Sequence, residues 1–236
     1  MLQAVTNNVV SRCVLGRKAE EENGPGKFGE LSRRAMVLIT AFCFGDFFPC
    51  LRWLDIVTGH IGRINTTFKA FDAFLDQVIE EHKISKSEKK DFVHILLQLQ
   101  KDGRLEIDLT QNDMKAILQD MFVGGTDTTS TTLEWAMAEL VNHPNIMKNA
   151  QEEVDYKGLH FHLIPFGAGR RGCPGIPFGV AAVEYTLANI LYWFDWKLPG
   201  GAIDHEKLDM TEVYGLTVPK KFPLSLVPTL YSPSNL

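Results

Sequence analysis

The sequence predicts a mainly α-helical fold with little β-structure. Apolar residues recur at helical spacing in most segments between residues 3 and 194. The longest such segment, residues 111–142, would form a rod roughly 45 to 50 Å long at a rise of about 1.5 Å per residue. The composition agrees with a globular domain, because 45% of the 236 residues are hydrophobic and 22% are charged. The net charge of −5, with acids and bases interspersed, argues against a nucleic-acid partner.

Four helices are predicted ahead of the longest one, at residues 3–18, 28–44, 63–82 and 87–100, because each spaces its large apolar residues three or four positions apart. An acidic loop rich in glycine and proline separates the first two. Residues 47–55 form an aromatic connector, whose rings are expected to pack in the core. His94 falls on the margin of the fourth helix and is expected to have a packing role. The most apolar run, residues 35–44, is far shorter than the roughly twenty residues that span a bilayer.

The longest helix has a defined start and an unusual centre. Thr110 and Asp113 fit a capping box, and His143-Pro144 ends the pattern. In the middle, Gly124-Gly125 costs about 2 kcal/mol relative to two alanines, and several threonines follow. Such a centre indicates either close packing against another helix or a chemical role.

After residue 154 the chain changes character. Residues 155–165 are predicted to be loop and extended structure, in which His160 and His162 alternate with apolar residues. The two histidines could bind a metal on a strand or face solvent, and solvent exposure is favoured. A glycine-rich loop at 165–176 leads into an apolar helix at about 177–193, and residues 180–194 are expected to bury against the longest helix.

The glycine-rich loop carries Cys173, the last of four cysteines. Gly169, Gly172 and Gly175 give the backbone conformations that other residues avoid. Neighbouring arginines and the start of the next helix favour the thiolate. Such a thiolate can attack a substrate, form a disulfide or hold a metal, and no second cysteine is close in sequence. A single axial thiolate on haem iron fits best, and a buried structural cysteine is the alternative. Cys13, Cys43 and Cys50 are expected to be buried free thiols, because they lie among apolar residues.

The loop resembles the haem-ligand loop of the cytochrome P-450 monooxygenases, in the form found in plants. The pattern Phe-x-x-Gly-x-Arg-x-Cys-x-Gly is filled by Phe166, Gly169, Arg171, Cys173 and Gly175. The resemblance implies that Cys173 is the protein ligand of the iron, and thus the metal-binding residue, and that Arg171 pairs with a haem propionate. It also implies a partial cytochrome P-450 fold, with the helix at 111–142 central. In this fold the connector at 47–55 resembles the segment that roofs the substrate cavity and dips towards the membrane, a second account of its aromatic rings. Residues 209–218 resemble the family's C-terminal substrate-contacting turn, and residues 220–228 its closing strand.

The run Gly-Gly-Thr-Asp-Thr-Thr, which starts at Gly124, resembles the oxygen-binding groove of the same family. In that reading Gly124 and Gly125 let haem and dioxygen approach the helix. Asp127 and Thr128 would be the catalytic pair, which positions water and delivers protons for cleavage of the oxygen–oxygen bond.

The resemblance further implies haem b, O2 and electrons from NADPH through a flavoprotein reductase. The reaction would insert one oxygen atom into a small lipophilic metabolite. Members act at the cytosolic face of the endoplasmic reticulum membrane; no anchor is visible in this chain, so we expect only peripheral membrane contact, with a cytosolic location as the alternative. A non-catalytic haem-binding or interaction remnant is the alternative function.

Residues 1–236 are interpreted as a single incomplete domain. Segments that the family carries ahead of residue 1 are expected to be missing. So is the stretch with the Glu-x-x-Arg helix, which would lie between Val154 and Asp155 and marks a deletion junction at 154/155. We therefore expect impaired activity.

Overall fold

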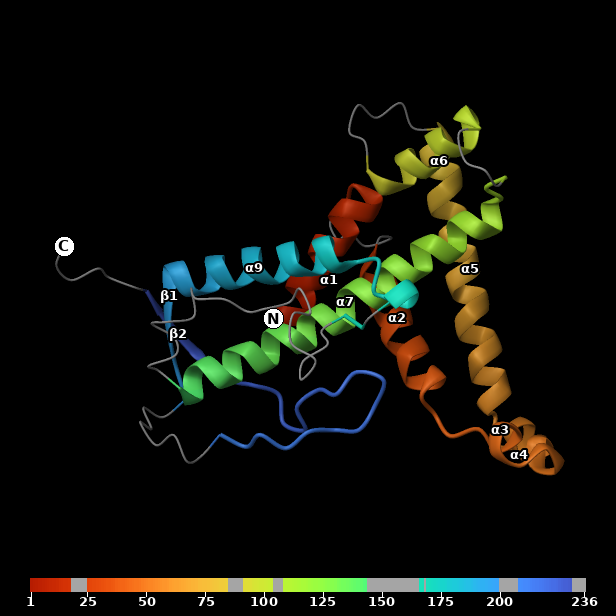
Figure 1. Ribbon diagram of the computed structural model, residues 1–236. Coiled ribbons are helices and arrows are strands. Elements are labelled where there is room, and N and C mark those ends of the chain that lie inside the picture. The colour runs from red at the N-terminus through yellow and green to blue at the C-terminus, as the bar shows by residue number, and fades with distance from the viewer. Residues whose placement is uncertain are drawn as a thin grey trace. The chain divides into compact units, whose positions relative to one another are not determined.

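The computed structural model describes residues 1–17, 25–84, 91–103, 108–143, 166–167, 169–199 and 208–230, and these are mainly helical (Figure 1). The helices are α1 (Leu2–Leu15), α2 (Pro25–Ile39), α3 (Phe44–Phe47), α4 (Arg52–Val57), α5 (His60–Ile84), α6 (Phe92–Asp102), α7 (Gln111–Asn142) and α9 (Ile176–Trp193), with 3-10 turns at Pro49–Leu51 and Gly169–Arg171. Two strands, β1 (Phe194–Lys197) and β2 (Val227–Leu230), pair antiparallel. The predicted fold class is confirmed.

The chain divides into two compact units. The first comprises Met1 and residues 3–127, and the second comprises Leu2 and residues 128–236. Helix α7 passes from one unit into the other, so the first half of its sequence belongs with the preceding helices and the second half with the C-terminal segments. The interpretation of residues 1–236 as one incomplete domain stays a prediction, as does the junction at 154/155.

The first unit has a core built by α1, α2, α5, α6 and the start of α7. Helix α2 packs against α5, which also contacts α4 and α6. The predicted apolar stripes face inward, and the buried side chains include Val10, Val14, Met36, Phe71, Leu75, Ile79, Val93, Leu96, Met114, Leu118 and Phe122. Lys115 of α7 donates to Asp72 and Asp76 of α5, at 2.6 and 3.0 Å. The predicted capping box is confirmed, because Asp113 Oδ2 accepts from the Thr110 amide at 2.9 Å and the Thr110 hydroxyl donates to the same oxygen.

The aromatic connector is more ordered than expected, because a side chain organises it. Asp55 is buried, and its carboxylate accepts from the amides of Phe44 and Gly45 at 2.8 and 2.7 Å. Burial opposes ionisation, yet these amides and the Cys43 thiol together hold the pKa of Asp55 below its usual range. The first amides of α3 are thus capped by a residue of α4. The expectation that the connector's rings pack in the core is wrong for Phe47, Phe48 and Trp53, which are exposed.

In the second unit, the C-terminal segment lies along the second half of α7. The indole of Trp135 donates to the carbonyl of Val218 at 2.8 Å, and the amide of Leu224 donates to Glu134 Oε1 at 3.0 Å. The buried Lys220 places its ammonium group 4.9 Å from the centre of the Trp135 ring. The sheet register pairs Phe194 with Leu230.

Helix α9 does not have the buried face that was expected. Among the described residues, only Thr186 of this helix is buried. Tyr185, Tyr192 and Trp193 are 69%, 71% and 57% exposed. Its apolar residues lie on several faces, so burying them requires partners on more than one side. The expectation that residues 180–194 bury against the longest helix is therefore wrong for this structure.

No single helix in the described part is both long and apolar enough to cross a membrane. The segments Glu30–Phe47 and Pro49–Val57 meet the length and hydropathy criteria only when taken together, and they are bent by 109°.

Candidate cofactor site

Cys173 lies in a tight loop just before α9. Its amide donates to the carbonyl of Phe166 at 2.9 Å, and its sulfur accepts from the amide of Gly175 at 3.3 Å. The Gly172 amide donates to the Gly169 carbonyl at 3.1 Å. The thiol is exposed, and α9 begins three residues later, at Ile176. The thiol thus sits at the start of a helix, and its sulfur accepts an amide hydrogen bond.

The backbone of this loop needs glycine. Gly167 and Gly169 have φ of 76° and 75°, which places both in the left-handed region. Phe166, at φ 65°, is the one described residue other than glycine in that region. Its ring lies against the first turn of α9, where a Cβ at Gly179 would be 3.6 Å from it. The loop is thereby held to the helix start at both ends.

The centre of α7 presents an open surface at Gly124. Among the described residues, no side chain or backbone atom outside the helix lies within 4 Å of a Cβ built there. Close packing of this glycine against another helix, one of the two explanations for the pair Gly124-Gly125, is therefore not observed in the described part. Two positions along, the Thr126 hydroxyl is buried and has no hydrogen-bond partner among the described residues.

Asp127 belongs to the first unit, where it meets α1. Gln3 Nε2 donates to Asp127 Oδ1 at 3.3 Å. Burial raises the pKa of Asp127, and this effect outweighs the opposing contributions of Gln3 and of the Arg33 charge. Asp127 therefore holds a proton more readily than a surface aspartate. Thr128 follows it and accepts at its carbonyl from the hydroxyl of Thr132, at 2.9 Å.

A sequence model of the family described as "Cytochrome P450" matches residues 1–157 and 155–224. The chain belongs to the cytochrome P450 family. The two matched segments meet at residues 155–157, and together they contain both the Gly124–Thr128 run and the Cys173 loop.

Plant cytochromes P450 resemble the chain over nearly its whole length. A phenylacetaldehyde oxime monooxygenase of Prunus mume is 38% identical over 99% of the chain and 62% of its own length. Cytochrome P450 71A1 of Persea americana is 36% identical over 96% of the chain and 64% of its own length. A desmethylyatein synthase of Sinopodophyllum hexandrum is 33% identical over 97% of the chain. The chain thus spans less than two thirds of the length of these relatives.

The family binds haem and uses dioxygen, and the residues present here fit that cofactor. Cys173 offers an accessible sulfur with an amide donor beside it. Gly124 has open space where a flat group can approach the helix. Arg170 and Arg171 are exposed, and neither forms an ion pair within the described ranges, so either guanidinium can meet a carboxylate. The cysteine loop belongs to the second unit, and the Gly124–Asp127 segment belongs to the first.

The other three cysteines differ from expectation. They are free, but Cys13 and Cys50 are exposed and Cys43 is only partly covered, so the prediction of buried thiols is wrong. Val14 beside Cys13 is buried, but Phe42 and Phe48, which lie near Cys43 and Cys50 in the sequence, are themselves exposed, so apolar neighbours did not indicate burial. His160 and His162 lie outside the described residues.

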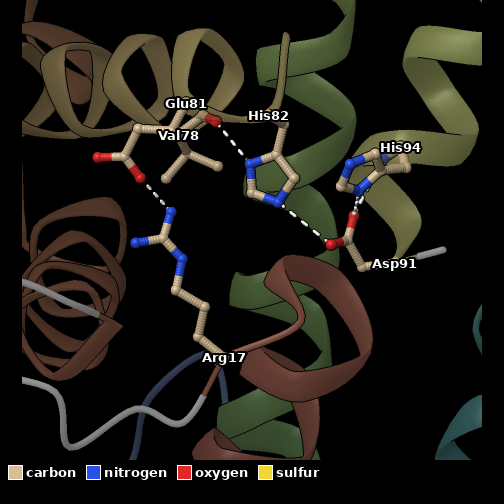
Figure 2. A network of polar contacts seen from close by, with 6 residues as sticks. All are labelled: Arg17, Val78, Glu81, His82, Asp91 and His94. Atoms are coloured by element: carbon tan, nitrogen blue, oxygen red, sulfur yellow. Dashed lines mark hydrogen bonds and ion pairs between the residues drawn. The ribbon is translucent and has the colours of Figure 1, made fainter. Parts of the chain in front are cut away.

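The structure also shows a buried polar network that the sequence analysis missed. Figure 2 shows His82 between the carbonyl of Val78 and Asp91, with His94 on the other side of that carboxylate. His94 was expected to have only a packing role. The signal in the sequence was an aspartate at a helix start with a histidine three residues later.

Proposed function

We propose that this chain derives from a haem-thiolate monooxygenase that inserts one oxygen atom of O2 into a small lipophilic metabolite. The observation that carries the proposal is the exposed Cys173 sulfur, held by a glycine-built loop at the start of α9 and facing the amide of Gly175. Family membership and the monooxygenase named among the relatives support it.

Haem, when bound, supplies the activation of dioxygen. Cys173 would be the ligand of its iron, and the Gly175 amide donates to the same sulfur. Phe166, Gly169 and Gly175 shape the loop, and Arg171 would pair with a propionate. By resemblance to the family, Gly124 and Gly125 would let the cofactor and dioxygen approach α7.

Asp127 and Thr128 handle protons in this proposal. Burial raises the pKa of Asp127, so that its carboxyl group can carry a proton and pass it on. The Thr128 hydroxyl orients a water molecule beside it. The two residues together would supply protons for the reaction of dioxygen.

Electrons for the reaction come from NADPH through a flavoprotein reductase, and the cytosolic face of the endoplasmic reticulum membrane is the proposed location. The deletion proposed at 154/155 removes a carboxylate–guanidinium network, and breaking such a buried pair costs about 3 to 5 kcal/mol. We infer that turnover by this chain is impaired.

The test is the spectrum of the reduced carbon monoxide complex after expression with a haem supply. We expect Cys173→Ala to abolish the thiolate-type absorption. Cys43→Ala and Cys50→Ala are matched controls, because they also remove a thiol with at least partial exposure, and they should retain it. Identical haem binding in all three variants would overturn the assignment of Cys173.

A further inference from the structure

Two histidines and an aspartate converge where α5 ends and α6 begins (Figure 2). His82 Nε2 lies 3.2 Å from Asp91 Oδ2, and His94 Nδ1 lies 2.8 Å from Asp91 Oδ1. The side chains of His82 and Asp91 are 6% and 7% exposed, and that of His94 is 19% exposed. One ligand atom from each residue can be chosen so that all three lie within 4.8 Å of one another. No part of the haem assignment uses these residues.

The hydrogen bonds of His82 determine which of its nitrogens can bind a cation. Nδ1 lies 2.7 Å from the carbonyl oxygen of Val78, which can only accept, so Nδ1 carries a hydrogen. In the neutral ring, Nε2 then presents a lone pair to a carboxylate oxygen, itself an acceptor. Two buried acceptors at 3.2 Å need a positive species between them. A metal-ligating histidine in proteins commonly donates its other ring N–H to a carbonyl in this way.

The surroundings of Asp91 also favour a cation next to its carboxylate. Its Oδ1 already accepts from the His94 amide at 2.9 Å, so Oδ2 is the oxygen left for a further partner. The end of α1 lies against that oxygen, because a Cβ built on Gly16 would be 2.8 Å from it. A helix C-terminus carries partial negative charge. The nearby guanidinium of Arg17 is engaged by Glu81.

His94 Nδ1 lies 2.8 Å from Asp91 Oδ1, which can only accept, so without a cation this nitrogen carries the ring hydrogen. A bound metal ion would displace that hydrogen from Nδ1, because metal binding releases protons from its ligands. Nε2 is buried and has no hydrogen-bond partner among the described residues, so it can hold the ring hydrogen while Nδ1 binds the ion. The ring centres of His82 and His94 are 4.9 Å apart, which brings both imidazoles to the same carboxylate.

We propose that His82 Nε2, Asp91 Oδ2 and His94 Nδ1 bind a divalent first-row transition metal, with zinc as the expected ion. Two imidazoles and one carboxylate suit zinc, whereas calcium and magnesium require more oxygen ligands. Two ligands each about 2.0 to 2.1 Å from a tetrahedral zinc lie roughly 3.3 Å apart, close to the separation of His82 Nε2 and Asp91 Oδ2, 3.2 Å. Water completes the coordination. The bound ion ties the end of α5 to the start of α6.

A zinc titration of the full chain tests the proposal. The purified protein is stripped with a chelator and titrated with Zn²⁺, by calorimetry and by competition with a chromogenic chelator. We expect the wild type to bind one more equivalent than His94→Gln and Asp91→Asn do. His143→Gln is the matched control, because His143 also contacts a carboxylate, Glu139, but is exposed, and it should keep the equivalent. The melting temperature should rise with Zn²⁺ in the wild type and in the control only.

His94→Gln keeps the test decisive if Asp91→Asn, which removes a charged helix cap, fails to fold, because His94 lies at the rim of the cluster. Equal zinc stoichiometry in the wild type and His94→Gln would overturn the proposal, since the zinc would then be held elsewhere, for instance by the exposed thiols. Absence of zinc binding by the wild type would overturn it too, and a proton on His82 would then satisfy the cluster.

Discussion

At the scale of single residues, burial decides how Asp127 behaves. Its neighbours Gln3 and Arg33 both favour the ionised form, yet burial dominates and the pKa is raised. The folded chain therefore holds this proton to a higher pH than the unfolded chain does. Stability falls as the pH rises from the unfolded pKa, about 4, through the native one.

We expect Asp127→Asn to abolish the fall in stability that accompanies ionisation of this carboxyl group. The variant should melt at a higher temperature than the wild type at pH 7, because no charge is then buried. The difference should vanish at a pH below about 4, where both chains are neutral at this position. Thermal melts followed by circular dichroism from pH 3 to about 8 measure it. A variant that is less stable than the wild type at pH 7 would show that the Gln3 contact matters more than burial does.

At the scale of elements, α7 combines a stable first half with an open centre. Met114, Leu118 and Phe122 are buried at successive turns, while Gly124 has no described neighbour outside the helix near its missing Cβ. Among the described residues, nothing outside the helix occupies the space that a side chain at Gly124 would fill. We expect another group to approach there, because a glycine inside a helix costs about 1 kcal/mol relative to alanine.

Gly124→Ala should raise the stability of the chain and lower its affinity for haem. We expect the haem-free chain to gain up to about 1 kcal/mol in its free energy of unfolding, because alanine forms helix better and its methyl group meets open space. Haem affinity should fall. Gly62→Ala in α5 is the control, since its Cβ also meets nothing within 4 Å among the described residues, and it should stabilise the chain without changing haem affinity. Urea denaturation and a haem titration give the two numbers; unchanged haem affinity in Gly124→Ala would argue against a cofactor at α7.

The elements show what local sequence can and cannot predict. Apolar spacing predicted α1, α2, α5, α6 and α7, because one buried stripe determines such a helix, but the predicted ends differ by up to five residues, at the end of α2 and the start of α6. The structure of the aromatic connector was harder to predict, because Asp55 caps amides that lie 10 and 11 residues away in the sequence. The exposure of α9 depends on which partners are present. The meeting of His82 with Asp91 and His94 depends on how two helices cross, which no spacing rule contains.

At the scale of the whole molecule, the exposed apolar surface of α9 indicates a missing partner. Tyr185, Tyr192 and Trp193 are all more than half exposed on one helix. Large exposed apolar surfaces favour association. The deletion proposed between Val154 and Asp155 would remove segments that cover such surface.

Restoring that stretch should improve the protein. A chimera would carry, between Val154 and Asp155, the corresponding segment of the Prunus mume relative. We expect a higher ratio of haem absorbance to protein absorbance and less aggregate on size exclusion, because the added segment covers apolar surface. A glycine-serine insert of equal length is the control and should give neither gain. Full haem loading of the original chain, with turnover, would contradict the proposed impairment.

The contacts of α7 also determine which of its two halves can meet its partners first during synthesis. Asp127 completes the first unit, so all the residues of that unit are available once this position has left the ribosome. The second half of the same helix must wait, because Trp135 and Glu134 bind partners 83 and 90 residues further on, Val218 and Leu224. Ribosomes add about 5 to 20 residues per second, so roughly 5 to 20 s pass between the synthesis of Asp127 and that of Leu224. For that interval the nascent chain carries all the residues of the first unit together with a half-helix whose partners have not yet been synthesised.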